Sequence, residues 1–202
     1  MKCGFNQNCA DDPSVRLLTA GEIRTVYRER MTRDFPPDEL KPLRMIERAI
    51  RRGEYRCYGG FYGDDLAAYA FFATIRENGR TVWLFDYLAV DEPRRDRGVG
   101  SAFLQALRRD ILPEADIVLL EIDDPSFAEG EEREHRLRRE AFYLRNGLID
   151  TGLRACVFGV DFRILEVPVH GQHTIDICRP GYSAVYRHIL PVLLYRRMVS
   201  IK

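Results

Sequence analysis

Runs of apolar residues and stretches of helical periodicity follow one another along most of the chain. Bulky apolar residues fill positions 83–90 with little alternation, which is typical of a strand buried on both faces. From Ser101 to Leu107 apolar residues recur at helical spacing, and residues 117–122 predict another buried strand. Because a helix connects the two strands, we expect them to be parallel neighbours joined by a right-handed crossover.

The segments before this unit continue the pattern. Residues 15–18 predict a short first strand, and Thr19 is placed to cap the helix that follows. The sequence Phe35-Pro36-Pro37-Asp38 ends that helix, and a second one is expected from about residue 39 to Gly53. Residues 55–62 and 66–75 predict a hairpin, and Asn78-Gly79 predicts the next tight turn.

The C-terminal part predicts a strand at residues 161–167 and a further short strand at 174–178. Residues 181–198 predict an amphipathic helix, broken or restarted at Pro191, that packs on the core, covers a sheet edge or forms a homodimer contact. We find no repeat and no linker. The length suits a single domain over residues 1–202, with a core at about 15–167 and an extension at 168–202.

The turn at residues 91–100 has the features of an anion site. The first N–H groups of a helix have no intrahelical partner and lie at the positive end of its dipole, so they can bind phosphate. Gly98 and Gly100 let the backbone approach a ligand closely, while Arg94, Arg95 and Arg97 add charge that pairs with phosphate oxygens. The turn therefore predicts a phosphorylated cofactor.

Two common phosphate motifs do not fit this turn. A dinucleotide-binding fingerprint needs a glycine where Phe103 stands, and a P-loop needs Gly-Lys-Ser/Thr, which is absent. The pattern Arg95-x-x-Gly98-x-Gly100 after Leu88-Ala89-Val90 instead resembles the pyrophosphate loop of the GNAT superfamily of acyl-CoA-dependent N-acyltransferases. Residues 142–148, Phe-Tyr-Leu-Arg-Asn-Gly-Leu, are similar to the family's Phe-Tyr-x-x-x-Gly-Phe, and residues 117–122 are similar to its fifth strand.

This resemblance implies an α/β (α+β) fold, with helices on both faces of a mixed, mostly antiparallel twisted sheet and an extra C-terminal helix. Its central parallel strand pair would be splayed to admit acyl-CoA. The resemblance implies acetyl-CoA (coenzyme A) as cofactor, bound by Leu88, Ala89, Val90, Arg95, Asp96, Arg97, Gly98, Val99, Gly100, Ser101, Arg136 and Arg139. In the family, the first two helices and the last hairpin form the acceptor site. Here those segments match nothing diagnostic, so the amine acceptor, small molecule or protein, is left open.

Composition narrows the partners and the compartment. The formal net charge is zero, which argues against nucleic acid or membrane as an electrostatic partner. Five cysteines form no C-x-x-C pair, and His170 and His173 lack the partners of a zinc module, so we expect no metal. The N-terminus has no apolar core for a signal peptide, and no apolar run is long enough to span a bilayer. We therefore expect a cytoplasmic protein.

The charged helix before residue 148 carries two stripes. Arg136, Arg139 and Tyr143 fall on one stripe, and an apolar stripe runs through Leu137 and Leu144. By resemblance, the Tyr143 side faces the cofactor sulfur. The family usually has Asn at the position of Arg136, which contacts the pantetheine arm. Arg136 could instead reach a cofactor phosphate or an acidic acceptor.

Acetyl transfer to an amine needs a proton acceptor for the amine and a proton for the departing thiolate. Asp86, placed on the same strand face as Leu88 and Val90 by the period of two, and Glu121 are the candidate bases. Each could equally be a structural carboxylate paired with arginine. By resemblance, Tyr143 protonates the thiolate, with a packing role as its alternative, and the Val90 N–H polarises the thioester carbonyl.

Two function classes follow. The first is an N-acetyltransferase that moves an acetyl group from acetyl-CoA to a primary amine by direct attack in a ternary complex. The alternative is a non-catalytic acyl-CoA-binding sensor or interaction module of the same fold. Tyr143 favours the enzyme, whereas Arg136 in place of Asn keeps the alternative open.

Overall fold

The computed structural model describes residues 12–37 and 39–202, so Cys3, Cys9 and most of the N-terminal segment considered for a signal peptide lie outside the described residues. Within this part of the chain, eight strands form one sheet in the order β1-β2-β3-β4-β5-β7-β6-β8. Among the described strands, β4 and β5 are the only pair that is parallel. The strands are β1 Ser14–Leu17, β2 Tyr55–Tyr62, β3 Asp65–Glu77, β4 Arg80–Val90, β5 Ile117–Asp123, β6 Ile149–Val157, β7 Val160–Glu166 and β8 Val199–Ile201.

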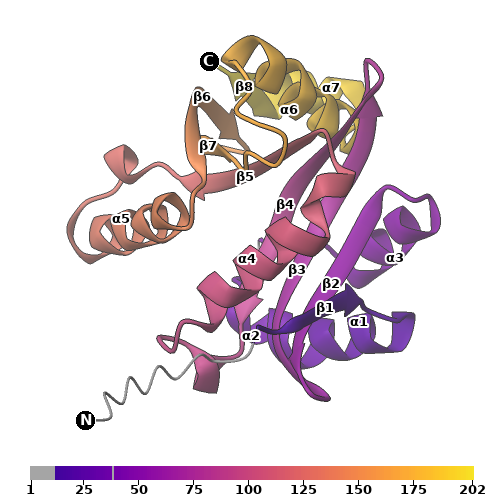
Figure 1. Cartoon of the computed structure of the whole chain (residues 1–202). Coiled ribbons are helices and arrows are strands. Elements are labelled where there is room, and N and C mark those ends of the chain that lie inside the picture. Colours follow the sequence, from indigo (N-terminus) through magenta and orange to yellow (C-terminus); the bar gives the residue numbers. More distant parts are fainter. Residues whose placement is uncertain (1–11, 38) are drawn as a thin grey trace.

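Helices cover both faces of the sheet, as Figure 1 shows. One face packs against α1, α3 and α6, and the other against α4 and the end of α5. None of the helices in the described part combines the length and the apolar character needed to cross a bilayer. The helices are α1 Ala20–Val26, continued by a π-helical turn at Tyr27–Met31, α2 Thr32–Asp34, α3 Leu43–Arg51, α4 Val99–Asp110, α5 Gly130–Arg145, α6 Ile175–Ile189 and α7 Val192–Met198.

Local signals in the sequence place several of these elements correctly. The Thr19 hydroxyl accepts a hydrogen bond from the Glu22 N–H, and the Glu22 carboxylate accepts one from the Thr19 N–H at 2.7 Å. This reciprocal pair satisfies two backbone donors at the start of α1 and confirms the expected cap. Asn78 and Gly79 both have positive φ, 51° and 78°, as a tight hairpin turn between β3 and β4 requires.

The central strands separate at their carboxyl ends. β4 and β5 pair only from Val82 opposite Ile117 to Phe85 opposite Leu120. Beyond these pairs β4 continues against β3 alone, and β5 continues against β7. The parallel pair and its splay agree with the fold class expected from the sequence.

A β-bulge marks the point of separation and corrects one prediction. Phe71 pairs with Tyr87 and Phe72 with Phe85, so Asp86 is an extra residue without a partner on β3. The bulge interrupts the alternation of side chains. Asp86 therefore turns toward Tyr55, on the face of α1 and α3, whereas Leu88 and Val90 pack against the opposite core. The expectation that Asp86 shares their face was wrong.

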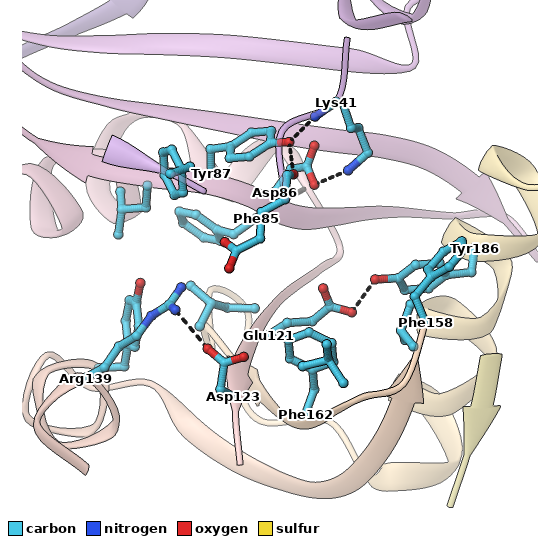
Figure 2. A pocket seen from close by; sticks show the side chains of 17 residues that line it. Lys41, Phe85, Asp86, Tyr87, Glu121, Asp123, Arg139, Phe158, Phe162 and Tyr186 are labelled. Carbon is cyan, nitrogen blue, oxygen red and sulfur yellow. Dashed lines mark hydrogen bonds and ion pairs between the residues drawn. The ribbon is translucent and has the colours of Figure 1, made fainter. Parts of the chain in front are cut away.

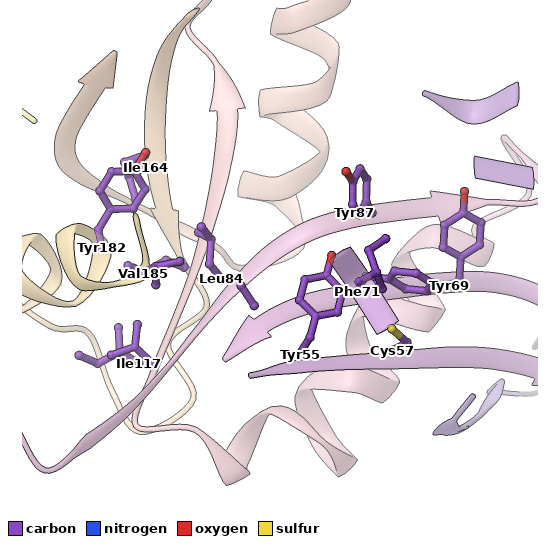
Figure 3. Packing of buried hydrophobic residues seen from close by; sticks show 14 of the residues in the cluster. Tyr55, Cys57, Tyr69, Phe71, Leu84, Tyr87, Ile117, Ile164, Tyr182 and Val185 are labelled. Carbon is purple, nitrogen blue, oxygen red and sulfur yellow. The ribbon is translucent and has the colours of Figure 1, made fainter. Parts of the chain in front are cut away.

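The C-terminal region also differs from the prediction. Residues 174–178 are not a strand but the cap and first turn of α6, which continues through Pro180. The helix tolerates this proline because its side chains are held by the core. Tyr182 and Val185 are fully buried, and Figure 3 shows them among the residues of this cluster. A Cβ on Gly181 would lie 3.2 Å from Val82 Cγ2, so α6 sits close to the sheet. The expected break at Pro191 is confirmed, while β6 and β8 were not predicted.

Candidate active site

The basic turn forms a cradle at the start of α4. Gly98 caps the helix with φ of 79°, a left-handed conformation that glycine adopts at little cost. A Cβ on Gly100 would lie 3.3 Å from both Phe142 Cζ and Val90 Cγ2. The absence of a side chain at Gly100 therefore brings α4 close to β4 and α5 and leaves its first N–H groups open to a ligand.

A cavity of about 430 Å³, here called the cofactor cavity, lies beside this cradle. It brings together most of the residues that the sequence assigned to the cofactor, but not Arg97, Val99, Arg136 or Arg139. Val99 is buried in the core and Arg97 is exposed. The lining residues are Asp34, Phe35, Leu88, Ala89, Val90, Arg95, Asp96, Gly98, Gly100, Ser101, Phe142 and Arg145.

Contacts within the protein fix Arg95 at the rim of the cofactor cavity. Its guanidinium donates to Asp34 Oδ1 at 2.8 Å and to the Val90 carbonyl at 3.1 Å. Asp34 is itself buried and accepts a hydrogen bond from the Tyr69 hydroxyl. These two contacts hold the Arg95 guanidinium beside the cradle, and the Asp34 carboxylate partly neutralises its positive charge. Arg145, which the sequence analysis missed, lies one helical turn after Phe142, with its guanidinium 5.1 Å from that ring.

A second cavity of about 260 Å³, the reaction cavity, opens where β4 and β5 separate (Figure 2). It shares Phe35 and Leu88 with the cofactor cavity, so the two are neighbours. All three residues predicted to be catalytic, Asp86, Glu121 and Tyr143, line it. The other lining residues are Phe35, Glu39, Lys41, Phe85, Tyr87, Leu88, Leu120, Asp123, Arg139, Val157, Phe158, Val160, Phe162 and Tyr186.

The Asp86 carboxylate forms an ion pair and a hydrogen bond within the protein. Lys41 Nζ forms an ion pair with Oδ1, and the Tyr55 hydroxyl donates to Oδ2. Burial and the Asp86 carboxylate together raise the pKa of Tyr55 well above its ordinary value, so the phenol stays protonated and keeps donating. Lys41 is further fixed because its backbone N–H donates to the Tyr87 hydroxyl at 2.9 Å. Both carboxylate oxygens are engaged, which favours the structural interpretation of Asp86.

Glu121 is held differently. The hydroxyls of Tyr182 and Tyr186, both on α6, donate to its Oε1, the second at 2.6 Å. Its Oε2 accepts no hydrogen bond from the described residues and points into the cavity in Figure 2. Burial raises the pKa of Glu121 above its ordinary value, although the two phenols and Lys41 act in the opposite direction. A carboxylate with a raised pKa and a free oxygen is suited to accept a proton.

Tyr143 and Arg139 meet at the opposite wall. Tyr143 is buried, and its phenol lies beside the Arg139 guanidinium, which also contacts Asp123 Oδ2 at 3.2 Å. Arg136 is not part of this group. It donates to Glu132 at 2.8 Å and to the Asp124 carbonyl at 3.1 Å, so it braces α5 against the segment after β5. Of the three residues on the predicted stripe, Arg139 and Tyr143 line the reaction cavity, whereas Arg136 has a structural role.

Sequence reasoning missed Lys41, Tyr55, Tyr182 and Tyr186. Lys41 had one available signal, as it is one of only three lysines in a chain rich in arginine. The tyrosines carried none, because they reach the site through strand pairing and helix packing across the sheet. In the described part of the chain, His, Cys, Asp and Glu form no group of three or more that could hold a metal ion.

The Acetyltransferase (GNAT) family model matches residues 22–143, more than half of the chain. The chain belongs to this family. The matched region contains the cradle, β4, β5, Glu121 and Tyr143, whereas α6 with Tyr182 and Tyr186 lies beyond it. A search of curated proteins gives no match.

Solved structures of GNAT proteins share the fold. A putative GNAT acetyltransferase from Bacteroides thetaiotaomicron aligns with a TM-score of 0.65 at 17% identity, over 87% of this chain and 98% of its own. The ribosomal-protein-S18-alanine N-acetyltransferase of Escherichia coli gives 0.53 at 17% identity, over 81% and 97%. A GNAT acetyltransferase from Elizabethkingia anophelis with acetyl-CoA bound gives 0.51 at 14% identity, over 78% and 98%.

Proposed function

We propose that this protein is an N-acetyltransferase that transfers an acetyl group from acetyl-CoA to a primary amine by direct attack in a ternary complex. One observation carries the proposal: an anion cradle and a cavity with an acid and a base candidate meet at Phe35 and Leu88, where β4 and β5 part. Acetyl-CoA is the co-substrate that fits the family, and the Elizabethkingia anophelis relative was crystallised with it.

The residues of the cofactor cavity fit a CoA molecule. The N–H groups at the start of α4 face the cradle that Gly98 and Gly100 keep clear, and Arg95 adds charge at its rim, which suits a pyrophosphate. Between Asp86 and Val90, β4 pairs only with β3, so one edge of its backbone remains available. The amide-rich pantetheine arm can hydrogen-bond to that edge, which leads from the cradle toward the reaction cavity.

The side chains of the reaction cavity suit the proton transfers. Glu121 Oε2 accepts a proton from the acceptor ammonium, which leaves a neutral amine with a free electron pair. The amine nitrogen forms a bond to the acetyl carbon while the bond from that carbon to sulfur breaks. Tyr143 donates its phenolic proton to the thiolate, and the second proton that the nitrogen loses on becoming an amide restores the phenol. Arg139 supplies positive charge where the negative charge develops. Acetyl-CoA supplies the activated thioester.

Asp86 takes a different role in this proposal. Since Lys41 and Tyr55 engage both of its oxygens, we assign it to holding the cavity wall. Asp86→Asn should therefore lower the melting temperature without removing the acidic limb of the pH profile. Loss of that limb would make Asp86 the base.

The proposal is tested by release of free CoA thiol over a panel of amines. Amine-dependent release supports an enzyme, whereas CoA binding without release supports the sensor alternative. Initial rates measured at several concentrations of both substrates should give intersecting lines. Parallel lines would indicate a covalent acetyl-enzyme and contradict direct attack.

A further inference from the structure

The reaction cavity has one apolar side, although charged side chains line other parts of it. Residues of the β6–β7 hairpin, Val157, Phe158, Val160 and Phe162, form one side, and Phe35 and Phe85 lie among the remaining walls. Phe158 and Val160 are 49% and 40% exposed, so this apolar surface continues to the solvent. Such walls favour the hydrocarbon part of a ligand over a second charged group, which would lose its hydration there.

The charges in the cavity are mostly paired with one another. Lys41 forms an ion pair with Asp86. Arg139 contacts Asp123 and is also attracted electrostatically to Glu39. Glu121 differs, because it has no ion pair within residues 12–37 and 39–202 and its oxygen contacts are two neutral phenols. Four carboxylates and two cationic side chains line the cavity, so it carries an excess of negative charge, and the free Oε2 of Glu121 is available to one cation of the ligand.

We propose that the acceptor is a primary monoamine with an aliphatic or aromatic body, whose ammonium binds Glu121 Oε2 while its body lies against the β6–β7 hairpin. This inference rests on the proposed function and names its substrate class. The ammonium gives its proton to Oε2 and becomes the neutral nucleophile, so the anchoring group and the proton acceptor are the same carboxylate.

The C-terminal helix α6 completes this arrangement. Tyr182 and Tyr186 lie outside the region that the family model covers, yet both donate to Oε1 of Glu121. Two donors on one oxygen fix the carboxylate plane and leave the other oxygen directed into the cavity (Figure 2). Tyr182 and Tyr186 are thus positioning residues that act through Glu121.

The substrate class is tested with phenethylamine, butylamine, spermidine and glutamate as acceptors. Phenethylamine and butylamine should have values of kcat/KM at least about tenfold above those of spermidine and glutamate, because the apolar β6–β7 side of the cavity offers no partner to a second charged group. Glu121→Gln should lower kcat/KM for phenethylamine by about 10²-fold while CoA affinity is unchanged. Preference for spermidine or glutamate, or full activity of Glu121→Gln, would overturn the inference.

Binding measurements separate this inference from the proposed function. Calorimetry of the CoA-bound protein should show phenethylamine binding that is weakened in Glu121→Gln, whereas phenylethanol, which lacks the charge, should bind far more weakly. Such binding without any acetyl transfer would support the site and refute the enzyme. Transfer to amines together with equal binding of phenethylamine and phenylethanol would support the enzyme and overturn the site.

The role of α6 is tested with Tyr186→Phe. Removing a donor that stabilises the Glu121 carboxylate should raise its pKa further, so the acidic limb of kcat/KM should move to higher pH. Tyr195→Phe is the matched control, since its hydroxyl contacts Ser183 rather than Glu121. In a Glu121→Gln background, Tyr186→Phe should cause no further loss. Carbon-13 NMR titration of labelled glutamates measures the pKa of Glu121 directly, without turnover. If this pKa is the same with and without the Tyr186→Phe substitution, the positioning role is contradicted.

Discussion

Replacing Gly100 by tryptophan tests the cofactor cradle most sharply. Gly100 is the second residue of α4, and even a Cβ there would lie 3.3 Å from Phe142 and Val90. An indole cannot be accommodated between these side chains, so it must project into the cofactor cavity that Gly100 lines. The substitution should therefore block the approach of a pyrophosphate to the first N–H groups of α4.

The size of the effect follows from linkage. A ligand at about 100 times its Kd stabilises the folded state by about 2.7 kcal/mol. For a chain of this length each kcal/mol shifts Tm by about 2–4 °C, so CoA should raise the Tm of the unsubstituted protein by about 5–11 °C. NAD and ATP at the same concentration should raise it much less, because neither carries a pantetheine arm. In Gly100→Trp the rise with CoA should disappear.

Thermal unfolding with and without CoA measures this difference within each variant, so the overpacking cost of the substitution itself, about 1–3 kcal/mol, does not enter the comparison. Gly21→Trp is the matched control. Gly21 is also the second residue of its helix, α1, and is exposed, and the nearest atom to its Cβ is Thr19 Oγ1 at 3.9 Å. Gly21→Trp should keep the full rise. An equal rise in Gly100→Trp, or equal stabilisation by ATP, would refute the cradle.

Three further substitutions test the site. Tyr143→Phe keeps the ring packing but removes the proton donor, so kcat should fall by about 10² to 10⁴ with unchanged acetyl-CoA affinity in steady-state kinetics; near-normal kcat with a lower Tm would make Tyr143 structural. Arg97→Ala should weaken CoA and dephospho-CoA equally in calorimetry if Arg97 serves the pyrophosphate, and no change for either would place it outside the site. Because burial raises the folded-state pKa of Glu121, its favourable contribution is complete below the ordinary pKa and is lost as the pH rises through the folded value. Glu121→Gln should therefore raise Tm near neutral pH, with a gain that shrinks in acid, and a Tm difference that does not vary with pH would contradict the raised pKa.

The predictions that succeeded depend on short-range chemistry. The Thr19 cap, the Asn78-Gly79 turn and the Gly98 turn each follow from residues that are neighbours in the sequence. The parallel pair β4 and β5 was also predictable, because a strand, a basic turn and a helix followed by another apolar run allow few other connections.

The errors arise where distant parts of the chain decide the outcome. Asp86 was assigned to the wrong face because the bulge depends on how β4 pairs with β3, which the alternation within β4 does not encode. Residues 174–178 looked like a strand because β-branched residues precede Pro180, but burial of α6 against the sheet favours a helix there. Tertiary packing overrode the local preference.

The hydrogen-bond partners of the charged side chains could not be predicted from the sequence either. Glu121 meets Tyr182 and Tyr186 across 61 and 65 residues, and no local pattern links them. Several acidic residues lie near Arg136 in the sequence, so its position on the predicted stripe did not determine its partner. In the structure it donates to Glu132 and to the Asp124 carbonyl. The sequence therefore indicated candidate residues for this site, whereas the fold determines which of them have polar atoms free to face the cavity.

The central claim is that acetyl transfer to an amine takes place at this site. Its most direct test is to incubate the purified protein with acetyl-CoA and phenethylamine and to quantify acetylated amine by mass spectrometry beside the free CoA thiol. We expect one acetylated amine for each CoA released, and neither product above background when the amine or the protein is omitted. CoA release without acetylated amine, or tight CoA binding with no acetylation of any amine in the panel, would contradict the account.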